Sequence, residues 1–190
     1  MQRKKIIVGI TGASGSVYGL KLLEALREIQ TVETHLIISD AGRCVLREEI
    51  GKDSSQQAES RADFHYDIRD FTAPVASGSY ITEGMIVAPC SAKTLASIAH
   101  GFSENLLARC ADVVLKERRK LVLLFRETPL NLSHIENMGK VTRMGAVVLP
   151  PIPAFYCGPR TVDDIVAHAI GKALDIFAVE HSLFKRWKSQ

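Results

Sequence analysis

Short apolar runs rich in β-branched residues alternate along the chain with longer segments in which apolar residues recur at helical spacing. The short runs predict strands at 6–10, 34–39, 83–89, 121–125 and 146–149. The longer segments predict helices at 17–29, 41–50, 91–99, 105–118, 132–143 and 161–177. Because strands that are apolar throughout are typical of parallel sheets buried on both faces, the pattern predicts an α/β fold with a mainly parallel sheet between helices.

Two segments lack such a pattern. Segment 51–79 is polar and charged, and no element is predicted in it. Segment 150–160 carries four prolines, which fix φ and predict a stiff, non-helical loop. Directly after it, Thr161 is a good N-cap residue and Asp164 stands three positions on, so a helix is predicted to begin there.

Length and composition indicate one folded domain covering residues 1–190, with a C-terminal tail at about 179–190. A mean hydropathy of +0.07 excludes a disordered chain. A formal net charge of +3 is too small to favour nucleic-acid binding, and the basic residues at 185–188 are interpreted as a solvated chain end.

No apolar stretch approaches the roughly 20 residues of a membrane helix, and the first one is too short for a signal peptide. A cytoplasmic protein is therefore predicted. The four cysteines, Cys44, Cys90, Cys110 and Cys157, form no C-x-x-C pair and match no zinc spacing. They are predicted to be reduced, mostly buried thiols, and no metal site is predicted.

A loop with the spacing G-x-x-G-x-x-G, residues 9–16, follows the first predicted strand and leads into a helix. Small residues let backbone N–H groups approach an anion there, and Thr11, Ser14 and Ser16 add hydroxyl donors. The loop predicts a phosphate site, the alternative being a tight turn that needs glycine for geometry alone. No Lys follows as in a P-loop, and Ser39 rather than an acidic residue ends the second strand, which weakens a dinucleotide interpretation.

A second polar turn, residues 89–94, follows the third predicted strand. Ser91 is placed as an N-cap, and its hydroxyl, that of Thr94 and the free N–H groups of the helix also offer a cradle for an anion. Two such turns at neighbouring strand ends predict a ligand with several polar groups, such as a flavin nucleotide.

Candidate charged groups occur in two further places. Arg109 and Lys116 are seven positions apart on one predicted helix and share a face, for which a solvated charged surface is the ordinary explanation. Arg126 and Glu127 directly follow strand 121–125, where Arg suits a bidentate phosphate contact and Glu suits proton transfer. A purely structural Arg–Glu pair is the alternative.

Six motifs in this order resemble those of the UbiX/Pad-type flavin prenyltransferases. They are TGASG at 11–15, PCSAKTL at 89–95, ADVVLKERRK at 111–120, RETPL at 126–130, HIENM at 134–138 and PPIPAFY at 150–156. The resemblance runs from about residue 6 to residue 177. The Ser-Ala-Lys-Thr sequence at 91–94 is similar to the branch of this family that accompanies phenolic acid decarboxylases.

This resemblance implies a Rossmann-like, three-layer flavoprotein fold and a specific reaction. Such enzymes join a dimethylallyl group from dimethylallyl phosphate to N5 and C6 of reduced FMN, without a metal. The product, prenylated FMN, is the cofactor of a UbiD-type aromatic acid decarboxylase. Family members form dodecamers with their sites where neighbouring chains meet, so a homo-oligomer is expected here.

The resemblance also assigns residues. FMN binding falls on Gly12, Ala13, Ser14, Ser39, Ser91, Ala92, Lys93, Thr94 and Arg126. Catalysis falls on Ser14, Glu49, Arg109, Lys116, Arg126 and Glu127, and binding of the prenyl phosphate falls on Tyr156 and Lys172. Two positions depart from the family pattern: Phe125 stands where many members have Pro, and Lys172 where Arg is common.

The assigned residue types suit the chemistry, because two phosphates bound close together need several cations. Glu127 and Glu49 are the two candidates for taking the proton lost when the flavin ring regains aromaticity. Two other functions stay open on the sequence. One is a flavin-dependent cysteine decarboxylase on the same scaffold, for which the cations would be surplus; the other is a non-catalytic protein that carries FMN for a decarboxylase.

Overall fold

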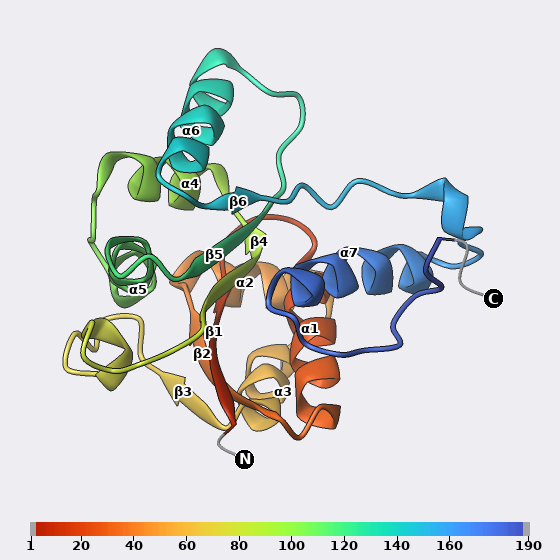
Figure 1. Ribbon diagram of the computed structural model, residues 1–190, viewed down its shortest axis with the longest axis horizontal. Helices are drawn as coiled ribbons and strands as arrows, with labels where there is room; N and C mark the ends of the chain where they lie inside the picture. The colour runs from red at the N-terminus through yellow and green to blue at the C-terminus, as the bar shows by residue number, and fades with distance from the viewer. Residues whose placement is uncertain (1–2, 188–190) are drawn as a thin grey trace.

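The computed structural model describes residues 3–187, and within them six strands form one parallel sheet (Figure 1). The strands are β1 (Lys4–Ile10), β2 (Val32–Ile38), β3 (Phe64–Tyr66), β4 (Gly84–Cys90), β5 (Lys120–Phe125) and β6 (Val147–Val148). Their order across the sheet is β3-β2-β1-β4-β5-β6. The order reverses between β1 and β4, and a reversal of this kind is where open parallel sheets bind ligands.

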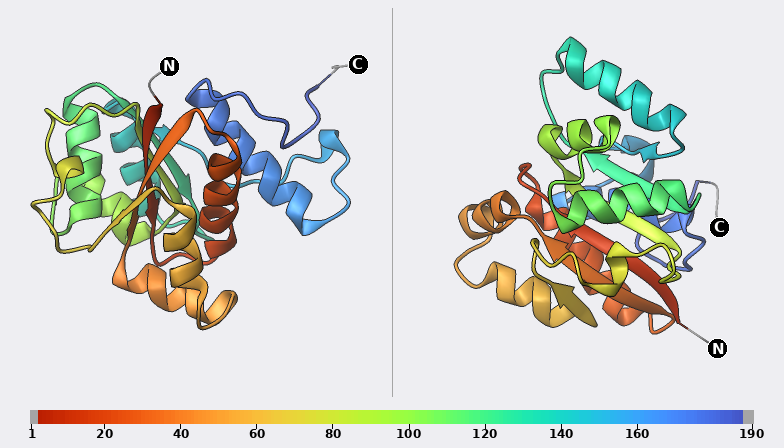
Figure 2. Two further views of the ribbon diagram at one scale, coloured as in Figure 1. Left: turned by 90° about the horizontal axis from the view of Figure 1, so that it is seen from below. Right: turned by 90° about the vertical axis from the view of Figure 1, so that its left-hand side faces the viewer.

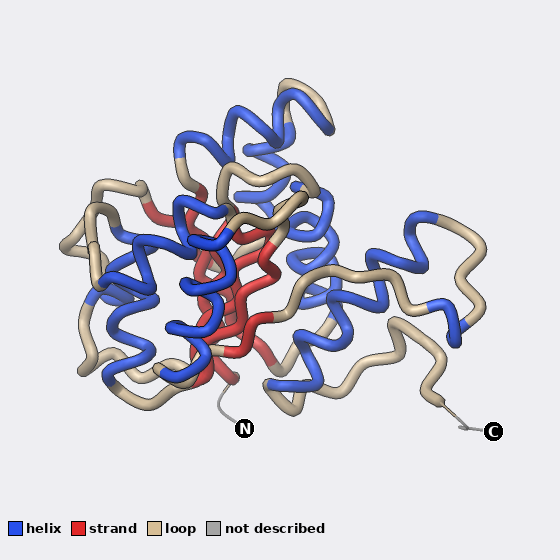
Figure 3. Tube along the Cα trace, turned by 90° about the horizontal axis from the view of Figure 1, so that it is seen from above, coloured by secondary structure: helices blue, strands red, loops and turns tan. Residues whose placement is uncertain are grey.

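Helices cover both faces of the sheet, as Figure 2 and Figure 3 show. The helices are α1 (Ser16–Glu28), α2 (Asp40–Glu49), α3 (Ser54–Arg61), α4 (Ala92–His100), α5 (Leu106–Lys116), α6 (Leu132–Arg143) and α7 (Val162–Ile176), with the short 3₁₀ helices η1 (Pro74–Ala76) and η2 (Phe155–Cys157). α1, α3 and α7 pack on the face that receives Ile6 and Val8 of β1. α4, α5 and α6 pack on the face that receives Ile7, because successive strand residues point to opposite faces.

The strands and helices that the hydrophobic pattern predicts are present, and the sheet is parallel throughout. Segment 51–79, in which the sequence predicts no element, contains α3, β3 and η1. α3 reads Ser-Ser-Gln-Gln-Ala-Glu-Ser-Arg, in which Ala58 is the one apolar residue, so no hydrophobic period marks it. The proline-rich segment 150–160 is predicted to be non-helical, yet η2 lies inside it.

Part of the predicted C-terminal tail, residues 179–187, packs back on α7. Phe184 and His181 lie over Gly171, where an added Cβ would come within 2.5 Å of the Phe184 ring. The Arg186 guanidinium pairs with the Asp175 carboxylate at 2.7 Å. Lys185 and Arg186 are exposed, in line with the interpretation of a solvated chain end, although Arg186 is also held by this ion pair; Lys188 lies outside the described residues.

The expectation of mostly buried thiols holds for two of the four cysteines. Cys90 and Cys110 are buried, and burial raises the pKa of the Cys110 thiol to about 12. Cys44 is exposed on α2 and Cys157 is half-buried on η2. Within residues 3–187, no helix has the length and apolar character needed to cross a membrane. Over the same residues, no group of His, Cys, Asp or Glu side chains is arranged to hold a metal ion.

Candidate active site

A cavity of about 480 Å³ opens at the carboxyl edge of the sheet, between the loops that follow β1, β2, β4 and β5. Seven residues that the sequence singles out line it: Gly12, Ser39, Ser91, Ala92, Lys93, Thr94 and Glu127. Ala13, Ser14 and Arg126 are not part of the lining. The structure thus brings most of the predicted FMN-binding set together in one hollow.

The turn between β4 and α4 forms a polar wall of this cavity. The Ser91 hydroxyl accepts from the Thr94 backbone N–H at 3.3 Å, which confirms Ser91 as the N-cap of α4. The Ser91 N–H donates to the Thr11 hydroxyl at 2.8 Å, so the loops after β1 and β4 are tied together. The first amides of α4, at Ala92 and Lys93, have no acceptor among the described residues, and a helix start leaves such donors free for a ligand.

The mouth of the cavity carries an ion pair between residues for which the sequence gives no chemical role. The Asp40 carboxylate and the Arg69 guanidinium lie 2.7 Å apart, and both side chains are mostly exposed. Next to Asp40, the Ser39 hydroxyl accepts from the Gly42 N–H at 3.0 Å and caps α2. A Cβ at Gly42 would lie 2.6 Å from the Ile10 carbonyl oxygen, so only glycine lets α2 begin this close to the end of β1.

The Gly-rich loop after β1 is an anion site, but the anion is a carboxylate of the protein itself. Glu49, the last residue of α2, accepts from the N–H of Gly15 at 3.0 Å, the N–H of Ser16 at 2.8 Å and the Ser16 hydroxyl at 2.7 Å. Burial raises the pKa of Glu49, but hydrogen bonds from the side chains of Ser16 and Ser14 and from the two backbone amides outweigh it. The pKa of Glu49 therefore lies below its ordinary value.

Arg126 and Glu127 do not pair with each other, so the structural Arg–Glu pair that the sequence leaves open is not formed. Glu127 lines the cavity and accepts from the Thr128 N–H at 3.0 Å. The half-buried Arg126 guanidinium has no hydrogen-bond or ion-pair partner within residues 3–187, and its charge opposes the rise that burial gives to the pKa of Tyr18. A cation without a protein partner is available to an anionic ligand.

Arg109 and Lys116 do not line the cavity. Arg109 donates from Nε to the Ala76 carbonyl at 3.2 Å and pairs with Asp112 at 2.9 Å, while Lys116 pairs with Glu117. α5 starts at the cavity and runs for 11 residues to Lys116, a rise of about 16 Å. In a single chain, Lys116 therefore lies toward the opposite, amino edge of the sheet.

Tyr156 and Lys172 form a third group, on α7 and the loop before it, across the sheet from α4 and α5 (Figure 1). The Tyr156 side chain is largely exposed, and its hydroxyl lies 3.1 Å from Nε2 of His168. Lys172 pairs with Asp175 at 3.7 Å. The predicted site residues of one chain thus fall into three separate groups.

Comparison with known proteins identifies the family. A family model described as Flavoprotein matches residues 1–176. The flavin prenyltransferase UbiX of Neisseria meningitidis serogroup B is 51% identical over 185 residues, covering 97% of each chain. The flavin prenyltransferase UbiX of Escherichia coli K12 is 47% identical over 187 residues, covering 97% of this chain and 98% of that protein. The chain belongs to the UbiX family of flavin prenyltransferases.

Solved structures of the UbiX family share this fold closely. AnUbiX (PadA1), solved in complex with FMN and dimethylallyl pyrophosphate, matches with a TM-score of 0.94 and 44% identity over the whole of both chains. A dodecameric FMN-dependent UbiX-like decarboxylase from Escherichia coli O157:H7 matches with a TM-score of 0.94 and 49% identity over 97% of this chain and 100% of that one. The FMN-dependent cysteine decarboxylase TvaF is 16% identical with a TM-score of 0.64, which shows the fold alone.

Several lining residues of this UbiX-family cavity lie outside the motifs. Ile68 and Arg69 come from the segment without a hydrophobic period, so no pattern marks them. Leu107 shows in the sequence only as one apolar position of a helix. Asn105 has a usable signal, because Asn directly before a predicted helix is a typical N-cap, and its side chain accepts from the Ala108 N–H.

Proposed function

We propose that this chain, in the cytoplasm, joins the dimethylallyl group of dimethylallyl phosphate to N5 and C6 of reduced FMN. The prenylated FMN then serves a UbiD-type aromatic acid decarboxylase. The observation that carries the proposal is the cavity at the carboxyl edge, where residues matching the family's FMN positions converge in a chain 51% identical to a UbiX flavin prenyltransferase.

The cavity suits FMN in size and in polarity. Its volume of about 480 Å³ lies in the range of roughly 300–1,000 Å³ that is usual for small-molecule sites. The free amides at the start of α4 suit the FMN phosphate, because a helix N-terminus favours an anion. Lys93 adds a positive charge beside them, although it also pairs with the Glu104 carboxylate of the same cavity at 3.8 Å. Ile68 and Leu107 offer apolar surface for the isoalloxazine ring.

Transfer of the prenyl group requires a stabilised leaving group and the movement of protons. As N5 bonds to the prenyl carbon, the C–O bond breaks and its electron pair leaves with the phosphate, whose charge Arg126 is free to neutralise. Of the two protons displaced from N5 and C6, one is taken up by the prenyl chain and one leaves with the phosphate, so no net oxidation occurs. We assign the proton from C6 to Glu127, which lines the cavity, with Glu49 as the second candidate.

We further propose that the complete site is shared between copies of the chain. Arg109, Lys116, Tyr156 and Lys172 lie away from the cavity of their own chain, although the family pattern gives all four a role at the reacting groups. A homo-oligomer, with a dodecamer as the expected form, would bring these residues to the cavity of a neighbour. The dodecameric structure of the Escherichia coli O157:H7 relative supports this arrangement.

The test is direct detection of the product. The purified protein is incubated without oxygen with reduced FMN and either dimethylallyl phosphate or dimethylallyl diphosphate, and the flavin is analysed by mass spectrometry. We expect the flavin mass to rise by one prenyl unit, with an equal amount of inorganic phosphate released from dimethylallyl phosphate or of pyrophosphate released from dimethylallyl diphosphate, and no change when the prenyl donor is omitted.

Flavin that stays unmodified with both donors would contradict the proposal. A cysteine-ending peptide that loses carbon dioxide when it is incubated with the same protein and oxidised FMN, which accepts the two electrons, would favour the cysteine decarboxylase instead. Adding the reaction mixture to an apo UbiD-type decarboxylase tests the last step. If Glu127→Gln still binds FMN but no longer activates the decarboxylase, the chain does more than carry FMN.

A further inference from the structure

His168 contacts the phenol of Tyr156 and has no role in the proposed reaction so far. It lies on α7, and its Nε2 is 3.1 Å from the Tyr156 hydroxyl oxygen, with the two rings edge-to-face at 5.8 Å between centroids. The imidazole also contacts Phe184 of the tail, with 4.7 Å between the ring centroids. The imidazole therefore packs against two aromatic rings, and Nε2 lies within hydrogen-bond distance of a hydroxyl.

His168 also shares a helix face with Lys172. The two residues are four positions apart on α7, so their side chains lie one turn apart on the same side. Burial lowers the pKa of His168 below its ordinary value, and the charge of Lys172 lowers it further. Near neutral pH, His168 is therefore a neutral imidazole with a single N–H.

The single proton of Tyr156 decides what this contact can do. A phosphate dianion offers only acceptors, so Tyr156 can hold it only by donating its one O–H. Burial and a hydrogen bond with the Cys157 thiol both raise the pKa of Tyr156 above its ordinary value, which keeps that proton in place. If the proton points to His168 instead, Tyr156 has nothing to give to the phosphate.

We propose that His168 is a positioning residue for the prenyl phosphate: its Nε2–H donates to the Tyr156 oxygen and directs the Tyr156 proton to the phosphate. This inference rests on the proposed function, because it takes Tyr156 and Lys172 as residues that hold the donor phosphate. It makes Tyr156, His168 and Lys172 one unit, in which His168 acts through Tyr156 and does not touch the reacting atoms.

The first test separates donor binding from flavin binding. Initial rates are measured against dimethylallyl phosphate concentration at saturating reduced FMN, for the full chain and for His168→Phe, His168→Asn and His168→Gln. His168→Phe keeps the ring against Phe184 but has no donor, and Asn is too short to reach Tyr156, so we expect KM for dimethylallyl phosphate to rise about five- to tenfold in both. Gln reaches as far as Nε2 and donates from an amide, so its KM should stay within about twofold of the wild type.

In all three variants we expect kcat to change less than about twofold and the dissociation constant of FMN to stay unchanged. The control is His65→Phe, because His65 is exposed on the edge strand β3, outside the lining of the cavity, and should leave every constant unchanged. Binding of FMN to each variant shows that it is folded. Since two different losses and one rescue are compared, a folding defect in one variant leaves the test decisive.

A double-mutant cycle tests whether His168 acts through Tyr156. Tyr156→Phe should raise KM for dimethylallyl phosphate, and adding His168→Phe to it should raise KM no further, because the group that His168 orients is already gone. Effects that multiply would overturn the inference, and so would an unchanged KM in His168→Phe and His168→Asn while Tyr156→Phe raises it. Both of those results leave the proposed function standing. An unchanged KM in Tyr156→Phe would remove Tyr156 from the phosphate site and overturn the inference, whereas no prenylated flavin from the wild type contradicts the proposed function itself.

Discussion

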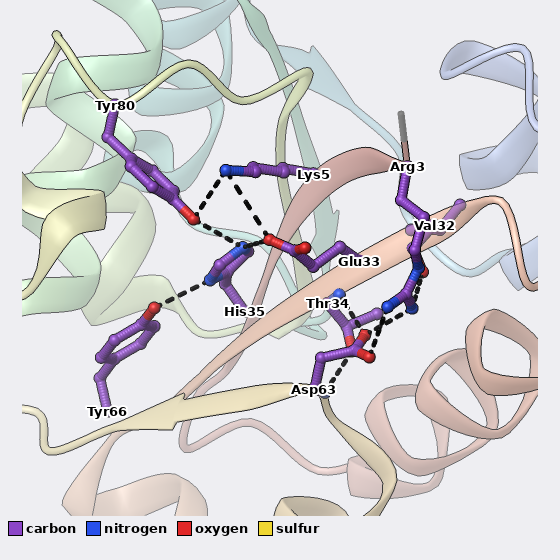
Figure 4. Close-up of polar contacts among 9 residues, drawn as sticks. All are labelled: Arg3, Lys5, Val32, Glu33, Thr34, His35, Asp63, Tyr66 and Tyr80. Atoms are coloured by element: carbon purple, nitrogen blue, oxygen red, sulfur yellow. Dashed lines mark hydrogen bonds and ion pairs between the residues drawn. The ribbon is translucent and has the colours of Figure 1, made fainter. Parts of the chain in front are cut away.

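The two ends of the sheet treat their polar side chains in opposite ways. Toward the amino end (Figure 4), a polar cluster reaches to His35 in the middle of β2, which is fully buried, with Nδ1 2.9 Å from the Tyr66 hydroxyl and Nε2 3.0 Å from the Glu33 carboxylate. Lys5 donates to the Tyr80 hydroxyl at 3.0 Å, and that hydroxyl lies 3.4 Å from the same histidine. Each of these side chains has a polar partner within the cluster, although Lys5 and Tyr80 also line a second cavity, of about 400 Å³.

At the carboxyl end, some polar groups have no partner among the described residues. The Arg126 guanidinium has no hydrogen-bond or ion-pair partner within residues 3–187, and the first amides of α4 have no acceptor there. Both ends draw on the same residue types, so composition does not distinguish them. The difference teaches that a polar cluster paired within itself holds the fold together, whereas donors left open beside a cavity are available for binding and catalysis.

The difference between the two ends predicts that a substitution at the carboxyl end causes the largest loss of activity without a loss of stability. In Glu127→Gln, formation of prenylated FMN should fall about 100-fold or more, because a general acid–base group contributes roughly 10²–10⁴ in rate. The midpoint of thermal unfolding should move by less than about 2 °C, since the carboxylate has no buried partner to lose. Product is measured by mass spectrometry, and Glu136→Gln, at an exposed position of α6, is the matched control. A Glu127→Gln enzyme with full activity would show that the cavity is not where the proton moves.

The amino end should show the reverse. His35→Leu removes both ring nitrogens, which leaves the Tyr66 hydroxyl without its partner and Glu33 with only the ion pair to Lys5 at 3.8 Å, so the free energy of unfolding should fall by about 2–4 kcal/mol. Urea unfolding at one fixed protein concentration measures it, because assembly adds to stability. The rate per folded molecule should stay within about twofold, and His65→Leu on the exposed side of β3 should cost less than about 0.5 kcal/mol. Lost activity in a stable His35→Leu would contradict a purely structural cluster.

The fold could be predicted from the sequence wherever the burial of one face gives the apolar residues a regular spacing along the chain. β1, β2, β4 and β5 lie inside the sheet, so they are apolar runs, and the amphipathic helices show the spacing of one buried face. α3 buries little besides Ala58, and β3 is an edge strand of three residues, so neither leaves a pattern. Helices and strands that are stabilised by their neighbours, rather than by an apolar face of their own, leave no hydrophobic period in the sequence and are not predicted from it.

The site could be predicted only in part, for a related reason. Residues next to the strand ends, such as Ser91 and Glu127, are placed by the strands themselves and converge as predicted. The sequence does not show which side chains meet in the folded chain. Only the structure therefore shows that the Glu49 carboxylate binds the loop after β1 and that Asp40 pairs with Arg69. The distance from Lys116 to the cavity follows from the length and direction of α5, which a motif does not encode.

Lys116 is an exception to the difference between the two ends of the sheet. It lies toward the amino edge, yet the family pattern gives it a role in catalysis. In Lys116→Ala, KM for dimethylallyl phosphate should rise about tenfold, the loss of one charged contact, while the dissociation constant of FMN stays within about twofold. Lys52→Ala, at an exposed loop position, is the control. An equal loss of both affinities would show that Lys116 does not act at the prenyl phosphate.

Mixing experiments test the sharing of sites that this requires. Lys116→Ala and Glu127→Gln chains are unfolded, mixed and reassembled together, and the activity is compared with that of each variant reassembled alone. If a neighbour supplies Lys116, some mixed sites contain both intact residues and activity returns. Activity no higher than the mean of the two variants would mean that each chain works alone.

The smallest expected effect is a difference between the two ends of the sheet in how stability and activity depend on pH. The pKa of Asp63 lies below its ordinary value, because hydrogen bonds from Arg3 and Thr34 outweigh the effect of burial. A carboxyl whose pKa is lowered by folding contributes stability above its unfolded pKa of about 3.9, and that contribution is lost as the pH falls through the folded value. Asp63→Asn should therefore cost about 0.5–1 kcal/mol at pH 7, a value kept small because the Arg3–Asp63 pair is partly exposed, and close to nothing at pH 3.

Thermal unfolding between pH 3 and pH 7 measures this difference, with Asp53→Asn at the exposed start of α3 as the control. Glu49 at the carboxyl end also has a lowered pKa, so the stability of Glu49→Gln should follow pH in the same direction. The two variants should differ in their rate of FMN prenylation at pH 7. Asp63→Asn should keep the wild-type rate. Glu49→Gln should be slower, because the Glu49 carboxylate holds the loop after β1 that borders the cavity. Equal rates in the two variants would remove the distinction between an end that only folds and an end that also reacts.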